Sequence, residues 1–392
     1  MTNIEFLLSE NVRAFIQTHV SSDVSQLMLN PPAEFRENIR LIGEQIKSRQ
    51  KIKLKLPNWY EDLRVIMPSA LSTEQSSSIP TAEYKAKLLR GEILIDLTGG
   101  MGVDTLALAE QYEKSHYVER SEQLCDVFRH NSKVLSKCKI DIHNTDAETF
   151  LERFKGKASF FIDPARREKQ KKVFHFENCS PNVIAMLPLF KEKAEQVMIK
   201  AAPMIDISLG IKQLQYAREV HVVSVKNEVK EVLFLLDFNI NASPLIKCVN
   251  LDSNHPELTF SQEEESNQNV AYSDIQNYLY DPNASITKAG AFKTVAARYE
   301  ISKVSSNTHL YSSDRLIEDF PGRRFEVIEP HLNKKNIKTL LPNRKANVMA
   351  KNYPMKADAL RKQLKLEDGG EMFVVGYRTL QQKSNLTLVR SI

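Results

Sequence analysis

Hydrophobic residues recur at helical spacing through the first 90 residues of the chain. In "IEFLLSENVRAFIQTHV" and "FRENIRLIGEQIKSRQKIK" they lie three and four positions apart, which is typical of amphipathic helices. Breakers separate these stretches, first "NPP" and later a serine-rich segment that ends at Pro80. The pattern predicts a helical N-terminal region over residues 1–90.

From Gly91 the hydrophobic pattern changes to short aliphatic runs that alternate with helix-spaced segments. The runs are "ILIDL", "SHYVE", "IDIHN", "ASFFIDP" and "QVMIKAAP". Strands that alternate with helices predict an α/β fold with a Rossmann-like, mainly parallel, doubly wound sheet. Two later runs, "REVHVVSVKNE" and "VKEVLFLLDF", are joined by a short polar turn, and they predict a β-hairpin that closes the sheet with an antiparallel strand.

Past Asn239 the sheet pattern fades. The segment "DSNHPELTFSQEEESNQNVAYSD" is polar and acidic, and we expect a loop or linker there. "NYLYDPNASITKAGAFKTVAARYEI" predicts a turn and a helix, and "EMFVVGYRTLQQKSNLTLVRSI" predicts a hairpin at the end of a small α/β module. The predicted organisation is a helical region over 1–90, a sheet domain over 91–260, a small linking segment over 272–322 and a basic module over 323–392.

Composition narrows the class of protein. No apolar run approaches the roughly 20 residues that span a bilayer, and the first residues lack the basic and apolar regions of a signal peptide. The four cysteines show no C-x-x-C spacing and no nearby histidine set, so neither a disulfide framework nor a zinc site is indicated. We therefore expect a cytoplasmic protein without a metal or a membrane partner.

Charge is concentrated at the C-terminal end. Residues 323–392 contain fifteen Lys and Arg but six Asp and Glu, a formal charge of +9, whereas the whole chain carries +5. This asymmetry fits a domain that binds a polyanion, and it also fits a solvated lysine-rich surface.

A glycine-rich loop follows the first predicted strand, with the sequence "TGGMGVD" from Thr98 to Asp104. A strand, a glycine turn and a helix form a ligand-binding corner in many α/β folds. The third glycine of the dinucleotide fingerprint is missing, and the carboxylate of Asp104 at the start of the helix would oppose a phosphate. No Gly-Lys-Ser/Thr follows, so a nicotinamide dehydrogenase and a P-loop enzyme are both disfavoured.

Four acidic residues follow the ends of four predicted strands: Asp96, Glu119, Asp146 and Asp163. Glu119 stands about 20 residues after the glycines, where an acid can accept hydrogen bonds from ribose hydroxyls. We expect Asp146 near an adenine amino group and Asp163 near a transferred group. Each acid alone is typical of a helix cap or a solvated loop. Together they favour a ligand with an ammonium group and a nucleoside but no phosphate, and S-adenosylmethionine has these groups.

On these residues, the segment from 91 to about 238 resembles the class I S-adenosylmethionine-dependent methyltransferases. "DLTGGMGVD", "YVER", "NTDAETFL" and "FFIDPARR" match successive motifs of that superfamily. The resemblance implies a seven-stranded Rossmann-like sheet and S-adenosylmethionine as the cofactor. The cofactor-binding residues it implies are Asp96, Thr98, Gly99, Gly100, Gly102, Asp104, Glu119 and Asp146.

The whole chain resembles a bacterial family of such enzymes that has a helical N-terminal region and a C-terminal THUMP-like domain. "YLYDPNASITKAGAF", "NTHLYSSD", "EDFPGR" and "GGEMFVVG" carry this resemblance. It implies a small ferredoxin-like segment over 272–322 and a THUMP-like domain over 323–392. THUMP domains of related families bind structured RNA, so the resemblance also implies a tRNA or rRNA substrate.

The fourth motif, "DPARR", is unusual. Enzymes that methylate exocyclic amines usually carry Asp or Asn, two prolines and an aromatic residue, and here only Asp163 and Pro164 match. Enzymes that methylate uracil carbon 5 need a cysteine nucleophile after the fifth strand. "MIKAAPMID" has none there, and Cys179 lies in a different segment. We expect direct methyl transfer with Asp163, Pro164 and Arg166 as catalytic residues, Asp163 orienting or deprotonating the acceptor.

Further candidates surround this motif. Arg166 either holds an anion or forms a salt bridge within its loop. The loop "RREKQKKVFHF" over 166–176 suits a flipped nucleotide and is equally an ordinary basic loop. Lys200 and Asp206 are expected near the acceptor pocket, and "STEQSSSIPTAEYKA" near the cofactor. Two alternatives to an RNA methyltransferase stay open, namely a methyltransferase that acts on a small molecule or protein, and an inactive relative that binds RNA.

Overall fold

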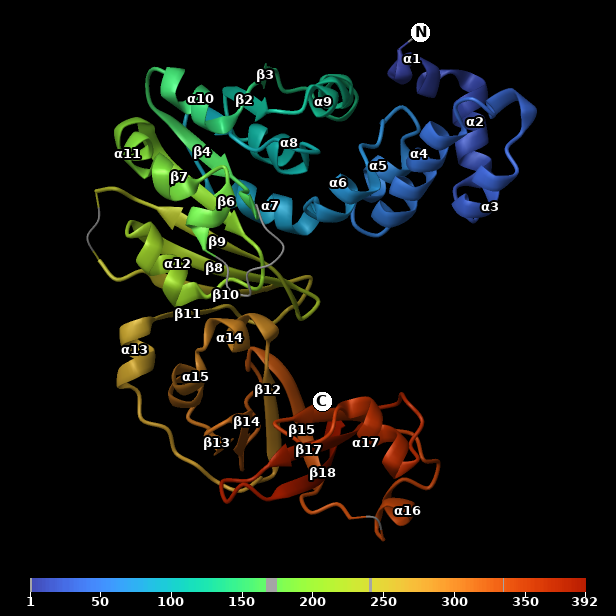
Figure 1. The fold of residues 1–392 in the computed structure, drawn as a ribbon. Coiled ribbons are helices and arrows are strands. Elements are labelled where there is room, and N and C mark those ends of the chain that lie inside the picture. Colours follow the sequence, from blue (N-terminus) through green and yellow to red (C-terminus); the bar gives the residue numbers. More distant parts are fainter. Residues whose placement is uncertain (1, 167–174, 240–241, 334) are drawn as a thin grey trace. The chain divides into compact units, whose positions relative to one another are not determined.

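The computed structural model describes residues 2–166, 175–239, 242–333 and 335–392 (Figure 1). The chain divides into two compact units. The first contains Met1–Arg218 and Leu233–Asn241, and the second contains Glu219–Val232 and Ala242–Ile392.

The N-terminal region is helical, as predicted. Its helices are α1 (Asn3–Leu8), α2 (Glu10–His19), α3 (Val24–Leu29), α4 (Ile39–Ile52), α5 (Pro57–Glu61), α6 (Ala70–Gln75) and α7 (Ile79–Leu88). Val12, Ile16, Ile42 and Ile46 are buried in one cluster, so the helically spaced apolar residues form a core. A second cluster joins Trp59 and other residues of this region to the glycine loop and the helices that follow it. The helical region therefore packs against the glycine loop, where the sequence predicts a ligand.

The alternating runs form a nine-stranded sheet. Its strands are β1 (Ile93–Asp96), β2 (Lys114–Glu119), β3 (Ile140–Asn144), β4 (Ala158–Ile162), β7 (Ala194–Ala201), β8 (Ala217–Val225), β9 (Glu228–Leu236), β10 (Leu245–Leu251) and β11 (Leu258–Ser261). The strand order is β11-β10-β8-β9-β7-β4-β1-β2-β3. β1 pairs in parallel with β2 and β4, β2 with β3, and β4 with β7. The predicted Rossmann-like parallel sheet is confirmed.

Helices cover both faces of the parallel strands (Figure 1). α8 (Val103–Ala109) and α9 (Glu122–Leu135) contact β2 on one face. α10 (Ala147–Arg153) contacts β2 on the other face, where α11 (Val183–Lys193) and α12 (Ile207–Leu214) follow. This arrangement is the doubly wound fold that the sequence predicts.

Strands β8 and β9 form the predicted hairpin. Its two-residue turn is Lys226-Asn227, with φ angles of 49° and 64°. Two consecutive positive φ values are typical of a type I′ turn, whose twist suits a tight hairpin.

The prediction of a loop or linker after Asn239 is wrong in part. β10 and β11 add two strands to the expected seven, and α13 (Gln262–Asn267) follows them. In β11, Leu258 and Phe260 are buried while Thr259 and Ser261 alternate with them. Four residues give too short a hydrophobic pattern to stand out within an acidic stretch.

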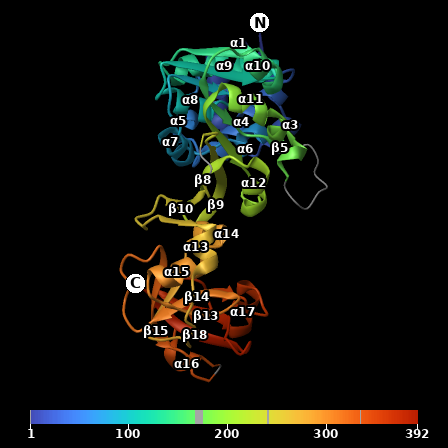
Figure 2. The same cartoon turned by 90° about the vertical axis from the view of Figure 1, so that its left-hand side faces the viewer.

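The second sheet contains seven strands, in the order β13-β14-β12-β15-β18-β17-β16. They are β12 (Tyr278–Pro282), β13 (Ser302–Ser305), β14 (Thr308–Ser313), β15 (Gly322–Glu329), β16 (Asn347–Lys351), β17 (Met372–Arg378) and β18 (Ser384–Ser391). α14 (Ala284–Ala289) and α15 (Phe292–Arg298) lie at one end of this sheet and α16 (Ile337–Leu340) at the other, while α17 (Ala357–Leu364) contacts β16 (Figures 1 and 2).

The predicted C-terminal hairpin is present as β17 and β18, which pair antiparallel. The segment expected to begin with a turn instead begins with strand β12. Leu279 of β12 and Phe325 of β15 share a buried cluster with Val375 and Val389. The boundary that the sequence predicts between 322 and 323 therefore falls at the start of β15, inside one continuous sheet.

Candidate active site

The glycine loop after β1 rests on two stacked aromatic rings. Tyr117 of β2 and Phe128 of α9 have ring centroids 3.9 Å apart and an interplanar angle of 7°. A Cβ atom on Gly99 would stand 2.1 Å from the Tyr117 ring, and one on Gly102 would stand 2.2 Å from the Phe128 ring. Gly102 also has a φ of 85°, in the left-handed region. Close packing thus explains why glycine occupies these two positions.

The outer side of the loop is open at Gly100. A Cβ atom there would meet only the Thr98 carbonyl oxygen, at 3.7 Å. The Gly100 amide donates to Oε2 of Glu119 (3.1 Å), and the Ser121 amide donates to Oε1 (2.8 Å). Each carboxylate oxygen has a second lone-pair direction. Glu119 at the rim of an open backbone surface therefore fits the two hydroxyls of a ribose.

Asp96 lies beneath this surface. It is 1% exposed, and its two oxygens accept from the Thr98 amide (2.9 Å) and the Thr105 hydroxyl (2.5 Å). Burial raises the pKa of Asp96 to about 7, with opposing hydrogen bonds from Thr105 and Thr98 and a further increase from Asp104 and Asp163. The hydrogen bonds of Asp96 therefore fix the conformation of the loop. A cationic ligand nearby would favour the charged form of this carboxyl group.

Asp104 is buried against helix α7. Its carboxylate lies 3.2 Å from Nζ of Lys85 and 3.5 Å from Nζ of Lys200, and it accepts a hydrogen bond from Ser77 (2.7 Å). Burial acts to raise the pKa of Asp104, but the two ammonium groups overcome this and hold the pKa below its usual value. These contacts therefore hold the first turn of α8 against α7.

Asp163 joins the acceptor motif to the glycine loop. Its amide donates to the Thr98 hydroxyl (2.7 Å), and its Oδ2 lies 2.6 Å from Nζ of Lys200. The Asp163 side chain is 38% exposed, whereas Pro164 is buried. Lys200 thus links Asp163 to Asp104, and Thr98 links Asp163 to the loop that faces the predicted cofactor.

Two other predicted acids act as helix caps. Asp146 accepts from the amide and the hydroxyl of Thr149 (2.8 Å each) at the start of α10. Asp206 accepts from the Leu209 amide (3.0 Å) at the start of α12. Both are exposed at the carboxyl ends of strands, and the described contacts do not link them to the group around Asp163.

Ala165 and Arg166 form strand β5 (Ala165–Arg166), which pairs antiparallel with β6 (Cys179–Ser180). Arg166 is in register with Cys179, so this cysteine is a backbone neighbour of the fourth motif and not remote from it. Cys179 is buried, and its Sγ donates a hydrogen bond to the His175 carbonyl oxygen. The Arg166 side chain and residues 167–174 of the predicted basic loop lie outside the described part of the chain.

The sequence did not single out Lys85, Tyr117 or Phe128, although Lys85 lies in the segment expected near the cofactor and Tyr117 begins the motif "YVER". Lys85 is fully buried on the same face of α7 as Thr81 and Ala82, a helical spacing that was visible in the sequence. The aromatic pair gave no such signal, because Tyr117 and Phe128 come together only through the packing of α9 on β2.

The described residues contain neither a metal-binding cluster nor a membrane-spanning helix. No group of three or more His, Cys, Asp or Glu side chains there is arranged to hold a metal ion. No helix in that part of the chain is both long enough and apolar enough to cross a bilayer.

Comparisons with known proteins find methyltransferase relatives. A candidate methyltransferase of Porphyromonas gingivalis W83 has a crystal structure that superposes with a TM-score of 0.86, at 29% identity over 99% of this chain and 98% of that one. Two curated proteins from Mycobacterium tuberculosis strains, each named an uncharacterized S-adenosylmethionine-dependent methyltransferase, are 23% identical over 306 residues, which is 77% of this chain and 82% of theirs.

Family models match the C-terminal end. One for a ferredoxin-like domain matches residues 278–321, and one for a THUMP-like domain matches residues 322–390. The expectations of a methyltransferase fold, of S-adenosylmethionine as cofactor and of a THUMP-like domain are confirmed. The chain is therefore a homologue of S-adenosylmethionine-dependent methyltransferases that carries a ferredoxin-like and a THUMP-like domain at its C-terminal end.

Proposed function

We propose that the chain is a cytoplasmic enzyme that transfers a methyl group from S-adenosylmethionine directly to a nucleotide of tRNA or rRNA. The THUMP-like match over 322–390 and the formal charge of +9 over 323–392 support RNA as the substrate. The open glycine loop beside Glu119 supports the cofactor.

S-adenosylmethionine supplies an electrophilic methyl group on a sulfonium. Glu119 would hold the ribose, and the open backbone at Gly100 would face the cofactor. Asp96 would fix the loop from beneath. Asp146 would lie near the adenine, at the end of β3.

Asp163 would orient the acceptor. Lys200 holds its Oδ2 and the Thr98 hydroxyl holds its amide, so the carboxylate has a fixed position beside the cofactor loop. Positioning an acceptor against the sulfonium and accepting its proton is most of what direct transfer needs. This tie between Asp163 and the glycine loop is the observation that carries the proposal.

Modified nucleosides test the proposal. We would digest total tRNA and rRNA from cells with and without the gene, and quantify methylated nucleosides by mass spectrometry. The proposal predicts one methylated nucleoside that is lost with the gene and returns with the wild-type gene but not with Asp163→Asn. Unchanged RNA with loss of a methylated protein or metabolite would favour the alternative acceptors.

A further inference from the structure

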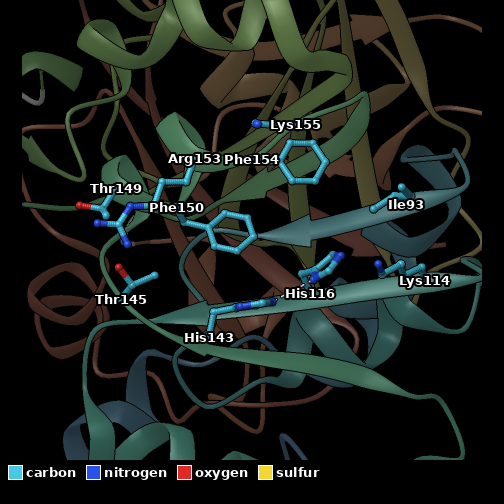
Figure 3. Close-up of a pocket in the computed structure, with 10 residues that line it drawn as sticks. All are labelled: Ile93, Lys114, His116, His143, Thr145, Thr149, Phe150, Arg153, Phe154 and Lys155. Atoms are coloured by element: carbon cyan, nitrogen blue, oxygen red, sulfur yellow. Dashed lines mark hydrogen bonds between the residues drawn. The ribbon is translucent and has the colours of Figure 1, made fainter.

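A cavity opens on the face of β2 that points away from the glycine loop. Tyr117 contacts the loop side, and consecutive strand residues point to opposite faces, so His116 points to the other side. There, a cavity of about 610 Å³ lies between β2, β3 and α10 (Figure 3). Its volume is within the range of small-molecule sites, roughly 300–1,000 Å³.

The inner walls of this cavity are aromatic. His116 and His143 line the strand side, and Phe150 and Phe154 line the α10 side (Figure 3). Nδ1 of His116 lies 2.9 Å from Nε2 of His143, and the His143 and Phe150 ring centroids are 4.8 Å apart. A planar aromatic ligand could stack on the rings of the paired histidines and the phenylalanines.

The rim of the cavity is cationic. Lys114, Arg153 and Lys155 line it, and no lining residue is acidic. Within the described part of the chain, no carboxylate forms an ion pair with any of these three side chains. Two carboxylates lie near the cavity. Asp141 is 3.7 Å from Nδ1 of His116. Hydrogen bonds from Thr149 lower the pKa of Asp146, and the charge of Arg153 helps to lower it. In the cavity of about 380 Å³ beside α14, by contrast, Arg323 and Lys351 each lie 2.6 Å from the buried carboxylate of Asp281. No ion pair among the described residues therefore occupies the three cations at the rim, and their side chains can contact an anion.

We propose that the cavity between β2, β3 and α10 binds one unpaired nucleotide of the RNA substrate. The base would stack on Phe150 and the histidine pair, and its phosphate would lie against Arg153 and Lys155. Stacking on aromatic rings with cationic contacts to phosphate is how proteins hold single-stranded nucleic acid. The identification of the bound nucleotide as part of an RNA rests on the proposed function. The cavity would be a second point of RNA contact, in addition to the THUMP-like domain.

A mononucleotide tests the cavity without RNA. The full chain would be saturated with S-adenosylhomocysteine to fill the cofactor corner and then titrated calorimetrically with 5′-AMP and with adenosine. We expect 5′-AMP to bind and adenosine to bind roughly tenfold more weakly. Adenosine has no phosphate, and the loss of one hydrogen bond to a charged group weakens binding by about that factor. Absence of 5′-AMP binding, or equal binding of both ligands, would overturn the proposal.

Variants place the site. Arg153→Gln removes an exposed rim charge, and Phe150→Leu removes a ring while it keeps most of the side-chain volume. Each should weaken 5′-AMP binding roughly tenfold. The matched control Lys157→Gln removes an exposed charge two residues beyond Lys155 and outside the cavity lining, so it should leave binding unchanged. Equal 5′-AMP affinity in all variants would overturn the proposal, and thermal unfolding would verify that Phe150→Leu is folded.

Binding of tRNA separates this inference from the proposed function. If tRNA binds and Arg153→Gln and Phe150→Leu bind it as tightly as wild type, the inference fails and the proposed function stands. If no RNA binds, the proposed function fails and with it the assignment of the occupant to RNA. Weaker binding of both 5′-AMP and tRNA by the two variants, with the control unchanged, is the expected result.

Discussion

At the scale of single residues, the proposed methyl transfer depends most on the position of Asp163. The sequence identified this carboxylate from its place after a strand, and the structure adds its contact with Lys200 and its tie to Thr98. The sequence placed Lys200 near the acceptor pocket and Thr98 in the cofactor loop, but it did not predict their contacts with Asp163, because the three residues are far apart along the chain.

We predict that Asp163→Asn reduces the rate of methyl transfer by roughly 100-fold or more and leaves cofactor affinity nearly unchanged. A positioned acid–base group contributes about that factor to the rate. Single-turnover rates and calorimetric titration with S-adenosylmethionine would measure the two quantities separately. Asp206→Asn is the matched control, because asparagine also caps a helix and Asp206 makes no described contact with this group. A wild-type rate in Asp163→Asn would contradict the assignment.

Asp96 predicts a pH dependence of folding stability. Its pKa in the folded protein is raised to about 7 from 3.8, so between these values the folded state retains a proton that the unfolded state has lost. Its contribution to stability therefore falls as pH rises through this window, by at most about 1.4 kcal/mol per pH unit. Asp96→Asn lacks this titration and should gain stability relative to wild type between pH 5 and 7. Urea unfolding across this range measures the difference, and parallel curves for the two proteins would be inconsistent with a raised pKa.

At the scale of elements, the fold was largely predictable because strands and helices of ordinary length repeat with clear hydrophobic periods. The parallel strands, the β8–β9 hairpin and the helical N-terminal region all follow from that pattern. β11 did not, since its four residues lie in an acidic stretch. The helical spacing places Lys85 on the buried face of α7, but the pattern does not predict its ion pair with Asp104, which comes from α8.

We predict that Gly102→Ala destabilises the first unit by roughly 2–5 kcal/mol. The left-handed φ costs about 1–2 kcal/mol, and the clash with Phe128 adds about 1–3 kcal/mol. Gly370→Ala is a control with nearly the same φ, 83°, where a Cβ atom meets nothing within 4 Å. Calorimetric unfolding of both variants separates the two costs. A similar loss in each would show that the contact with Phe128 is unimportant.

The ion pair between α7 and α8 gives another prediction. Lys85→Met should destabilise the protein by up to about 3–5 kcal/mol, because the buried carboxylate of Asp104 then keeps only the ammonium of Lys200, at 3.5 Å, as a cationic partner. The double variant Lys85→Met/Asp104→Leu should recover much of this loss, because the uncompensated charge is then gone. Denaturant unfolding of the three proteins measures both effects. Equal stability of the single and double variants would argue against the pairing.

At the scale of the whole molecule, the charge asymmetry is evident from the sequence. The sequence does not predict that the two C-terminal segments share one sheet. The ferredoxin-like and THUMP-like matches meet at 321 and 322, yet β12 from one pairs with β15 from the other. Hydrophobic periodicity indicates strands and says little about which distant strand they pair with. Truncation at 322 would remove β15 from beside β12, so charge substitution is the better probe of this region.

We predict that the triple variant Lys335→Gln, Lys338→Gln and Lys362→Gln weakens tRNA binding and makes it less dependent on salt. Each phosphate contact that is lost should lower the slope of log affinity against log salt by about one. The control triple variant Lys133→Gln, Lys137→Gln and Lys139→Gln makes the same charge change at exposed positions of the methyltransferase unit. Fluorescence anisotropy at several salt concentrations gives the slopes. Equal slopes for both triple variants would argue against RNA contact through the THUMP-like domain.

The most direct test of the central claim is methyl transfer with purified components. RNA from cells that lack the gene would be incubated with the full chain and methyl-labelled S-adenosylmethionine, then digested to nucleosides and analysed by mass spectrometry. We expect label in one tRNA or rRNA nucleoside with the wild-type chain and far less with Asp163→Asn. No label in RNA from a chain that binds the cofactor would contradict the central claim.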